Sequence, residues 1–74
     1  MWQYNASQNR FTRLLPDGRS FEIESAGRAG WDLWYRRPPH PLCIGRFRTV
    51  DEAKAMAEDV ENQLARNREM HDDG

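Results

Sequence analysis

Apolar and polar residues alternate with a period of two over residues 31–36. Trp31, Leu33 and Tyr35 take one parity, and the residues between them take the other. Aromatic and aliphatic residues in this pattern are typical of a half-buried β-strand, in which every second side chain points into a core. We therefore predict a strand here, with Trp31, Leu33 and Tyr35 directed inward and Trp34 directed outward.

A second strand is predicted over residues 42–47. The three prolines between the two strands cannot donate hydrogen bonds to a ladder, so they mark the connection. Leu42 and Ile44 share a parity, whereas Gly45 interrupts the alternation before Phe47. A glycine within a strand pattern often marks a β-bulge. One extra residue there would bring Leu42, Ile44 and Phe47 to the same core.

The first part of the chain predicts a hairpin. Residues 10–15 form one strand, Pro16-Asp17-Gly18 is a strong turn signal, and residues 20–25 form a second strand with alternating apolar and acidic side chains. Residues 1–9 contain two aromatic side chains and leave two alternatives open. They form either a short edge strand or a loose N-terminal arm, because chain ends fray unless they are tied down.

The clearest local signal is the start of a helix at residue 50. Thr49 and Glu52 have the spacing of a capping box, in which each side chain satisfies a backbone N–H of the other residue. Beyond the cap, apolar residues recur at helical spacing and form one narrow stripe. The stripe consists of Ala53, Met56, Ala57, Val60 and Leu64. We predict a helix over residues 50–68 and a disordered tail over residues 69–74.

Together these elements predict an α+β domain over residues 1–68. It is an antiparallel meander of three to four strands, with one C-terminal helix packed on one face of the sheet. The apolar stripe of the helix must be buried, and the apolar face of the sheet is its natural partner. The sheet side of this core is expected to contain Phe21, Ile23, Trp31, Leu33, Tyr35, Leu42, Ile44 and Phe47.

Charge is distributed unevenly along the chain, although the net charge is only −1. Residues 1–48 carry eight arginines and four acids, whereas residues 49–74 carry three basic residues and eight acids. The basic sheet half and the acidic helix half could each meet a partner of opposite charge. The chain has one cysteine, no long apolar run and no signal peptide, so we expect a cytoplasmic protein with no membrane partner.

No group of residues predicts catalysis or metal binding. His40 and His71 stand apart from each other, without a cysteine or carboxylate cluster at ligand spacing. Cys43 has no neighbouring histidine to activate it, which favours a packed strand residue over a nucleophile. We expect no enzymatic activity, no metal, no cofactor and no small-molecule substrate. We also expect a monomer, with a weak dimer as the alternative.

Residues 30–57 carry a resemblance to a known family. Gly30-Trp31, Ile44-Gly45-x-Phe47-x-Thr49 and Glu52-Ala53 are similar to motifs of the DNA-binding domain of plant Apetala and ethylene-response factors, and of its relatives at the N-termini of phage integrases. In that family the sheet face away from the helix lies in the DNA major groove. The resemblance therefore implies that outward strand residues contact DNA. By position these residues are Trp34, Arg36, Cys43 and Arg46.

The first functional hypothesis is a non-enzymatic, nucleic-acid-binding accessory or regulatory protein, of a kind that a phage would encode. It would bind DNA through the sheet face away from the helix, because arginine bridges phosphates and pairs with guanine. Its candidate residues are Trp34, Arg36, Arg46, Arg48 and Arg13. Glu22 and Glu24 could instead neutralise some of these arginines across the strands, where the family has arginines of its own.

The second hypothesis is a small protein-binding module or an inhibitor of a host protein. It would act through the exposed aromatic strand or through the acidic helix. Its candidate residues are Trp34, Glu58, Asp59 and Glu61. An exposed tryptophan flanked by arginine is enriched at protein interfaces. The alternatives are that the N-terminal arm covers Trp34 with Trp2, and that the acidic helix is an ordinary solvated face.

Overall fold

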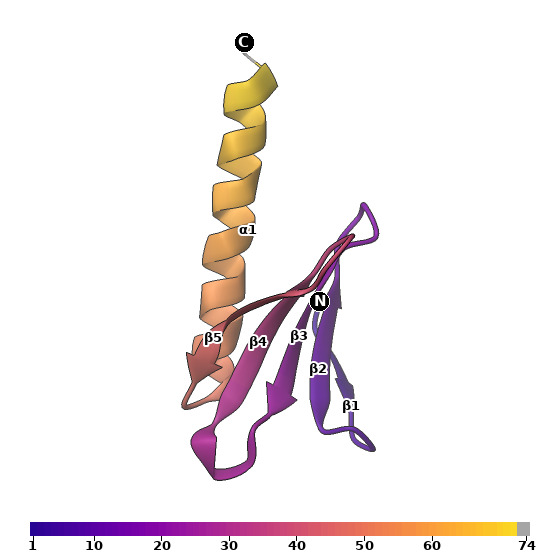
Figure 1. The fold of residues 1–74 in the computed structure, drawn as a ribbon, viewed down its shortest axis with the longest axis vertical. Helices are drawn as coiled ribbons and strands as arrows, with labels where there is room; N and C mark the ends of the chain where they lie inside the picture. Colours follow the sequence, from indigo (N-terminus) through magenta and orange to yellow (C-terminus); the bar gives the residue numbers. More distant parts are fainter. Residues whose placement is uncertain (73–74) are drawn as a thin grey trace.

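The computed structural model describes the backbone of residues 1–72 and the side chains of residues 1–67. Residues 1–72 form five strands, one turn of 3₁₀ helix and one long α-helix (Figure 1). In order these elements are β1 (Gln3–Asn5), β2 (Arg10–Leu14), β3 (Ser20–Ser25), η1 (Gly27–Ala29), β4 (Trp31–Arg36), β5 (Leu42–Phe47) and α1 (Val50–Asp72). The prediction of an α+β fold is confirmed.

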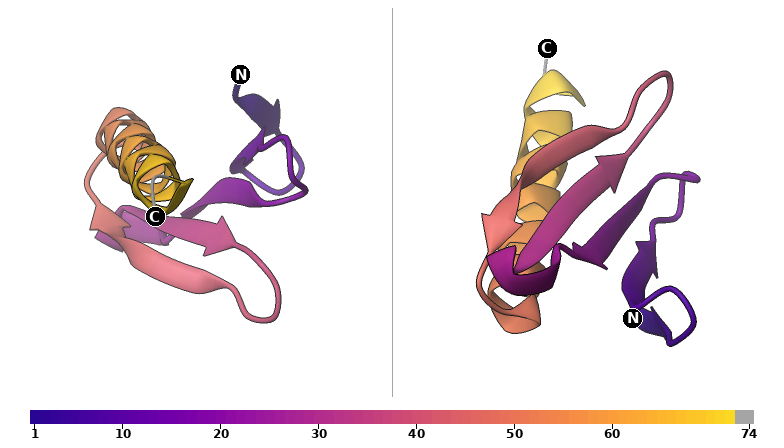
Figure 2. Two further views of the ribbon diagram at one scale, coloured as in Figure 1. Left: turned by 90° about the horizontal axis from the view of Figure 1, so that it is seen from above. Right: turned by 60° about the horizontal axis from the view of Figure 1, so that its bottom comes forward.

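The five strands form one antiparallel sheet, in which each strand pairs with its neighbour in sequence. The sheet therefore has five strands, whereas the sequence predicted three to four. The additional strand is β1, which resolves the two alternatives for the N-terminal residues in favour of an edge strand. Helix α1 packs across β3, β4 and β5 and leaves the other face of the sheet uncovered (Figure 2).

Aromatic contacts hold β1 in place. The ring of Tyr4 lies 4.7 Å from the ring of Phe11 on β2, measured between centroids. The ammonium group of Lys54 on α1 lies 5.0 Å from the centroid of the Phe11 ring and 6.0 Å from that of Trp2. The contact between the two tilted rings and the position of a cation over an aromatic face are each favourable. These contacts tie down an N-terminus that would otherwise fray.

The core lies between α1 and the apolar face of the sheet, as the strand parity predicted. Phe21, Ile23 and Leu33 are completely buried, and Ala53 and Ala57 of α1 are buried against the sheet. Small alanine side chains at these two positions let the helix approach the strands closely. The buried apolar surface of these residues supplies the main stabilising contribution in a domain of this size.

Two residues assigned to the core lie outside it, and one core residue was missed. Leu42 is 49% exposed, because it begins β5 in the part of the β4–β5 hairpin that diverges from α1 (Figure 1). Met56 is 36% exposed, since it lies at the margin of the stripe while its neighbour Ala57 faces the sheet. Leu15, just after β2, is buried with only 8% exposed. The expectation of a core position is therefore wrong for Leu42 and Met56.

The predicted bulge is present beside Gly45. Leu33 of β4 pairs with Gly45, and Trp34 pairs with Cys43, so that Ile44 is the extra residue between two pairs. Ile44 is half-buried and packs against the core, as does Phe47. The bulge restores the inward direction of Phe47 after the glycine, which is the effect that the sequence pattern predicted.

The helix begins where the capping residues predicted and continues further than expected. The backbone N–H of Glu52 donates to Thr49 Oγ1 at 3.1 Å, which satisfies one of the free amides of the first turn. Helix α1 then runs to Asp72, four residues beyond the expected end. The tail predicted over residues 69–74 thus falls partly within α1, and residues 73–74 lie outside the described part of the chain. None of the described helices has the length and apolar character needed to cross a membrane.

Candidate functional site

The sheet face opposite α1, here called the open face, is covered by no other element of the described chain (Figure 2). The register of the strands determines which side chains it carries, because residues opposite the buried parity point outward. Its central part is formed by Arg10, Thr12, Glu22, Glu24, Asp32, Trp34, Arg36, Cys43 and Arg46. The antiparallel sheet thus has one apolar side in the core and one mixed, charged side facing water.

Trp34 lies on the open face in the middle of β4, next to the edge strand β5. In the register it stands between Glu22 on β3 and Cys43 on β5. Its side chain is half-buried, and its indole Nε1 is shielded from water without a hydrogen-bond acceptor among the described residues. Trp2 does not cover it, because Trp2 packs near Lys54 on the helix side of the sheet. The part of the Trp34 ring that remains accessible is an apolar surface that an incoming partner could contact.

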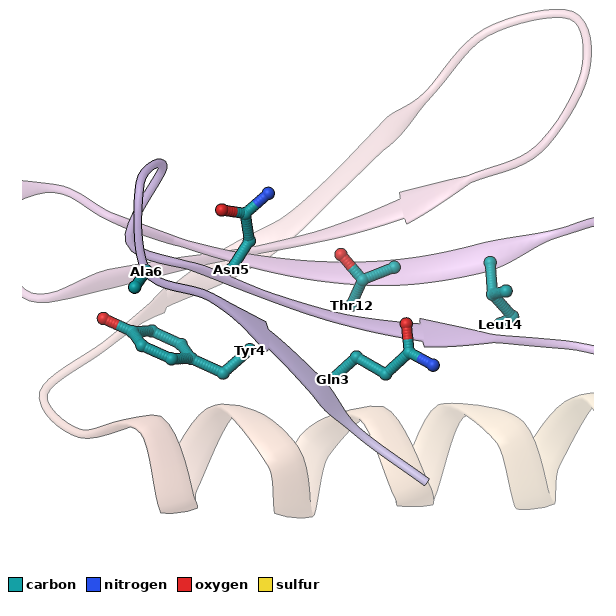
Figure 3. Close-up of a pocket in the computed structure, with 6 residues that line it drawn as sticks. All are labelled: Gln3, Tyr4, Asn5, Ala6, Thr12 and Leu14. Carbon is teal, nitrogen blue, oxygen red and sulfur yellow. The ribbon is translucent and has the colours of Figure 1, made fainter.

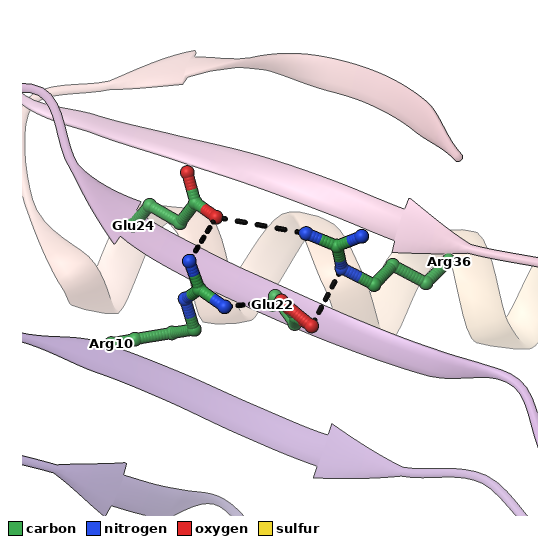
Figure 4. Close-up of polar contacts among 4 residues, drawn as sticks. All are labelled: Arg10, Glu22, Glu24 and Arg36. Atoms are coloured by element: carbon green, nitrogen blue, oxygen red, sulfur yellow. Dashed lines mark ion pairs between the residues drawn. The ribbon is translucent and has the colours of Figure 1, made fainter. Parts of the chain in front are cut away.

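Four charged side chains near Trp34 form ion pairs with one another. This arginine–glutamate cluster consists of Arg10, Glu22, Glu24 and Arg36 (Figure 4). Glu22 Oε1 lies 2.6 Å from Arg36 Nε, and Glu22 Oε2 lies 3.3 Å from Arg10 Nη1. Glu24 lies 2.8 Å from Arg10 Nη2 and 3.8 Å from Arg36 Nη2. Only 12% of the Glu22 side chain is exposed, so its charge is held between two guanidinium groups rather than by water. Two positive and two negative charges cancel within the cluster.

The remaining arginine of the open face is also paired. Arg46 Nε donates to Asp32 Oδ1 at 2.7 Å, and Arg46 Nη2 donates to Asp32 Oδ2 at 3.2 Å. This two-point hydrogen bond lowers the pKa of the Asp32 carboxyl below its usual value. The guanidinium side chain nevertheless remains 56% exposed. The open face as a whole carries three arginines and three acids, and all six are in ion pairs.

The five residues predicted to bind nucleic acid do not form one patch. Trp34, Arg36 and Arg46 come together on the open face. Arg13 points to the helix side, where its Nη2 lies 3.1 Å from Glu61 Oε2 of α1. Arg48 follows β5, is exposed and has no ion pair among the described residues. The sequence could not reveal these pairings, because they depend on which residues meet across neighbouring strands.

The acidic helix residues predicted for protein binding are also divided. Glu58 and Asp59 are exposed on α1 and have no ion pair among residues 1–67. Glu61 is half-buried and is already paired with Arg13. The helix therefore offers a smaller free acidic surface than its sequence indicates.

The role of Arg10 on the open face could not be recognised from the sequence alone. It pairs with Glu22 and Glu24 at once and closes the arginine–glutamate cluster. The alternation of arginine on one strand with glutamate on the next was the available signal. It became specific only when the register placed Arg10 opposite Glu24.

A shallow hollow of about 450 Å³ lies beside this surface between β1 and β2 (Figure 3). In Figure 3, Asn5, Thr12 and Leu14 point away from α1, while the Tyr4 ring lies lower beside β1. The residues lining the hollow are Gln3, Tyr4, Asn5, Ala6, Thr12 and Leu14. The Tyr4 hydroxyl donates to Asn9 Oδ1 at 2.9 Å and is thereby occupied. The lining contains no acid–base pair and no nucleophile, so we assign no chemistry to this hollow.

Among the residues that the structure describes, no three histidine, cysteine, aspartate or glutamate side chains gather in a way that could hold a metal ion. Cys43 is exposed on the open face as a free thiol, and His40 is exposed in the β4–β5 connection. Comparison of the chain with protein-family models, with curated proteins and with solved structures finds no match. The function is therefore inferred from the open face itself.

Proposed function

We propose that this protein is a non-enzymatic binding module whose open face docks onto another protein. The observation that carries the proposal is the position of Trp34, a half-buried tryptophan surrounded by arginine and acid side chains in fixed ion pairs. Tryptophan and arginine dominate the binding energy of protein interfaces when they lie near the centre and are ringed by other contacts. On the open face, ion pairs hold Arg36 and Arg46 in place before a partner arrives, and this reduces the conformational entropy lost on binding.

The charge balance of the open face favours a protein over a nucleic acid. Binding to a phosphate backbone gains most of its free energy from unpaired cations that displace counterions. On the open face each guanidinium group already has a carboxylate, so a phosphate would have to compete with Glu22, Glu24 or Asp32. A partner protein with mixed charges can match such a surface without breaking the pairs.

DNA binding is a second candidate function, favoured by a separate observation. Arg28, Arg37 and Arg48 are exposed and have no ion pair among residues 1–67. They could contact phosphates at the border of the sheet while Trp34, Arg36 and Arg46 face the groove, as the family resemblance implies. Three phosphate contacts would give a log–log salt slope of about −3.

The single cysteine allows a direct test of the first candidate. Cys43 lies beside Trp34 in the register and is exposed, so a maleimide carrying a photocrosslinker can be attached to the open face without a substitution. The matched control is Cys43→Ser with Gln63→Cys, which moves the same label to an exposed position of α1. In an extract of the source cells, a discrete protein adduct should form from Cys43 and not from the control.

The same adduct should disappear in the Trp34→Ala variant, provided that the variant retains its circular dichroism spectrum. Equal adducts from both label positions, or none from Cys43, would remove the support for protein docking at the open face. Anisotropy of a labelled DNA duplex at two salt concentrations then decides the second candidate. Salt-sensitive binding that is lost in Arg48→Glu would establish it.

A further inference from the structure

Strand β5 forms one edge of the sheet, and its outer side is unpaired. It bonds to β4 on one side, and no strand of the described residues lies on the other. No hydrogen bond from another described residue reaches its outer edge, and α1 packs across the sheet face rather than along this edge. At six residues, β5 is longer than β1, the three-residue strand at the opposite edge. An open edge of this length is a template for a further strand.

An arginine without an ion pair among residues 1–67 lies beyond each end of β5. Arg37 lies in the connection that leads into the strand, and Arg48 follows its last residue. Both are exposed, and neither has an ion pair among residues 1–67. Between them Arg46 remains 56% exposed, although Asp32 already neutralises it. The edge thus presents unpaired backbone groups flanked by two uncompensated guanidinium groups.

The end of the strand near Arg37 also has space for a side chain. A shallow hollow of about 280 Å³ lies there between the β2–β3 turn and the β4–β5 connection. Its lining includes Gly18, Arg36 and Arg37, together with Pro38 and Pro41. Arg36 is already paired with Glu22 and Glu24, whereas Arg37 has no ion pair among residues 1–67. The unpaired charge of Arg37 makes the hollow better suited to an acidic side chain than to an apolar one.

The charges argue against a second copy of this chain as the occupant. Two antiparallel β5 strands related by a twofold axis would bring arginines of both copies to the same short ladder, and like charges facing each other across a ladder are destabilising. Arginine at an edge is one of the devices by which proteins avoid pairing with themselves. The complementary occupant is an extended segment that carries carboxylates.

We propose that β5 accepts an extended acidic segment of a partner protein as a sixth strand. Main-chain hydrogen bonds to β5 provide affinity, and carboxylates at the two ends of the segment pair with Arg37 and Arg48. This inference concerns the edge of the sheet and not the open face, so either can fail without the other. The bulge at Ile44 bends the edge, and a short segment fits it better than a long strand.

A library of random short peptides displayed on phage, selected against the whole protein, tests this inference. Enriched peptides should share acidic residues at both ends of a segment with high strand propensity. A synthetic copy of an enriched peptide should bind about tenfold more weakly to Arg37→Glu or Arg48→Glu. Arg66→Glu is the matched control, because it makes the same charge change at an exposed position of α1 and should leave the affinity unchanged.

Two further measurements identify the binding mode. Amide hydrogen exchange within β5 should slow when the peptide is added, whereas the amides of β1 should not change. A peptide with N-methyl groups at alternate positions should lose binding, because it cannot donate to the edge. Failure to enrich acidic peptides, equal affinity of Arg48→Glu and Arg66→Glu, or full binding of the methylated peptide would overturn the proposal. Loss of the Cys43 adduct alone would not affect it.

Discussion

Arg36 Nε lies 2.6 Å from Glu22 Oε1, and the two side chains come from neighbouring strands. Their backbones are not directly opposite, because Glu22 faces Trp34 and Arg36 faces Ser20 in the register. The ion pair is therefore diagonal across the open face. Arg10 approaches the same carboxylate from the other side at 3.3 Å. Glu22 is the residue on which the neutrality of this surface depends.

Glu22→Gln tests this dependence. The change removes a carboxylate that is only 12% exposed and leaves Arg10 and Arg36 with weaker acceptors. We expect the free energy of unfolding to fall by about 1–2 kcal/mol, less than for a fully buried pair because water still reaches both arginines. Urea denaturation measures this change. Glu58→Gln, at an exposed position of α1, removes the same charge and should change the stability by less than about 0.5 kcal/mol.

Asp32 makes a predictable contribution to the pH dependence of stability. Its folded pKa is lowered by the hydrogen bonds from Arg46, so the contribution is present above the unfolded pKa of about 3.9. It is lost as the pH falls through the folded value. The wild type should therefore be more stable than Asp32→Asn near pH 7, and the difference should shrink below about pH 4.

Urea midpoints of the two proteins across this range provide the measurement. Asp17, whose pKa is lowered by Arg19, is present in both proteins, so its own acid loss cancels in the difference. A difference that stays constant down to the lowest pH would show that the Asp32–Arg46 pair does not contribute to stability.

Substitutions of Leu33 and Leu42 compare the part of the sheet that α1 covers with the part of the β4–β5 hairpin that diverges from α1. Leu33 is completely buried, whereas Leu42 is 49% exposed. Leu33→Ala should cost about 2–5 kcal/mol, because it leaves a cavity between β4 and α1. Leu42→Ala should cost less than about 1 kcal/mol, since the same atoms are already in contact with water. Similar losses in thermal unfolding of the two variants would contradict the position of the hairpin relative to the helix.

The strand parity was sufficient to predict the centre of the core. Phe21, Ile23 and Leu33 alternate with polar residues, and all three are buried as that alternation requires. The pattern failed for Leu42 because parity gives the direction of a side chain but not whether another element reaches it. The sequence left β1 undecided as well, since one contact that anchors the N-terminal residues comes from Lys54 of α1, far along the chain.

The candidate site was only partly predictable for a related reason. Trp34 faces outward because Trp31 faces inward, which follows from the strand period alone. The strand period does not determine which arginines are in ion pairs. Arg36 and Arg46 are neutralised and Arg48 is not, and this depends on cross-strand and diagonal neighbours that only the register determines. The net charge of a segment therefore overstated the positive charge available to a ligand.

Gly30 is required by the join between η1 and β4, and its replacement gives the sharpest test of the fold. Its φ is +116°, a conformation that side-chain-bearing residues rarely adopt, and a Cβ there would collide with the backbone carbonyl oxygen of Phe47 on β5. Gly30→Ala should therefore cost about 3 kcal/mol or more, combining backbone strain with displacement of the β4–β5 ladder. Gly27, with φ of +65°, is the control, because a Cβ there meets nothing within 4 Å. Gly27→Ala should cost about 1 kcal/mol from the backbone conformation alone. Chemical denaturation of both variants measures the two costs, and equal losses would mean that β5 does not pass as close to Gly30 as described.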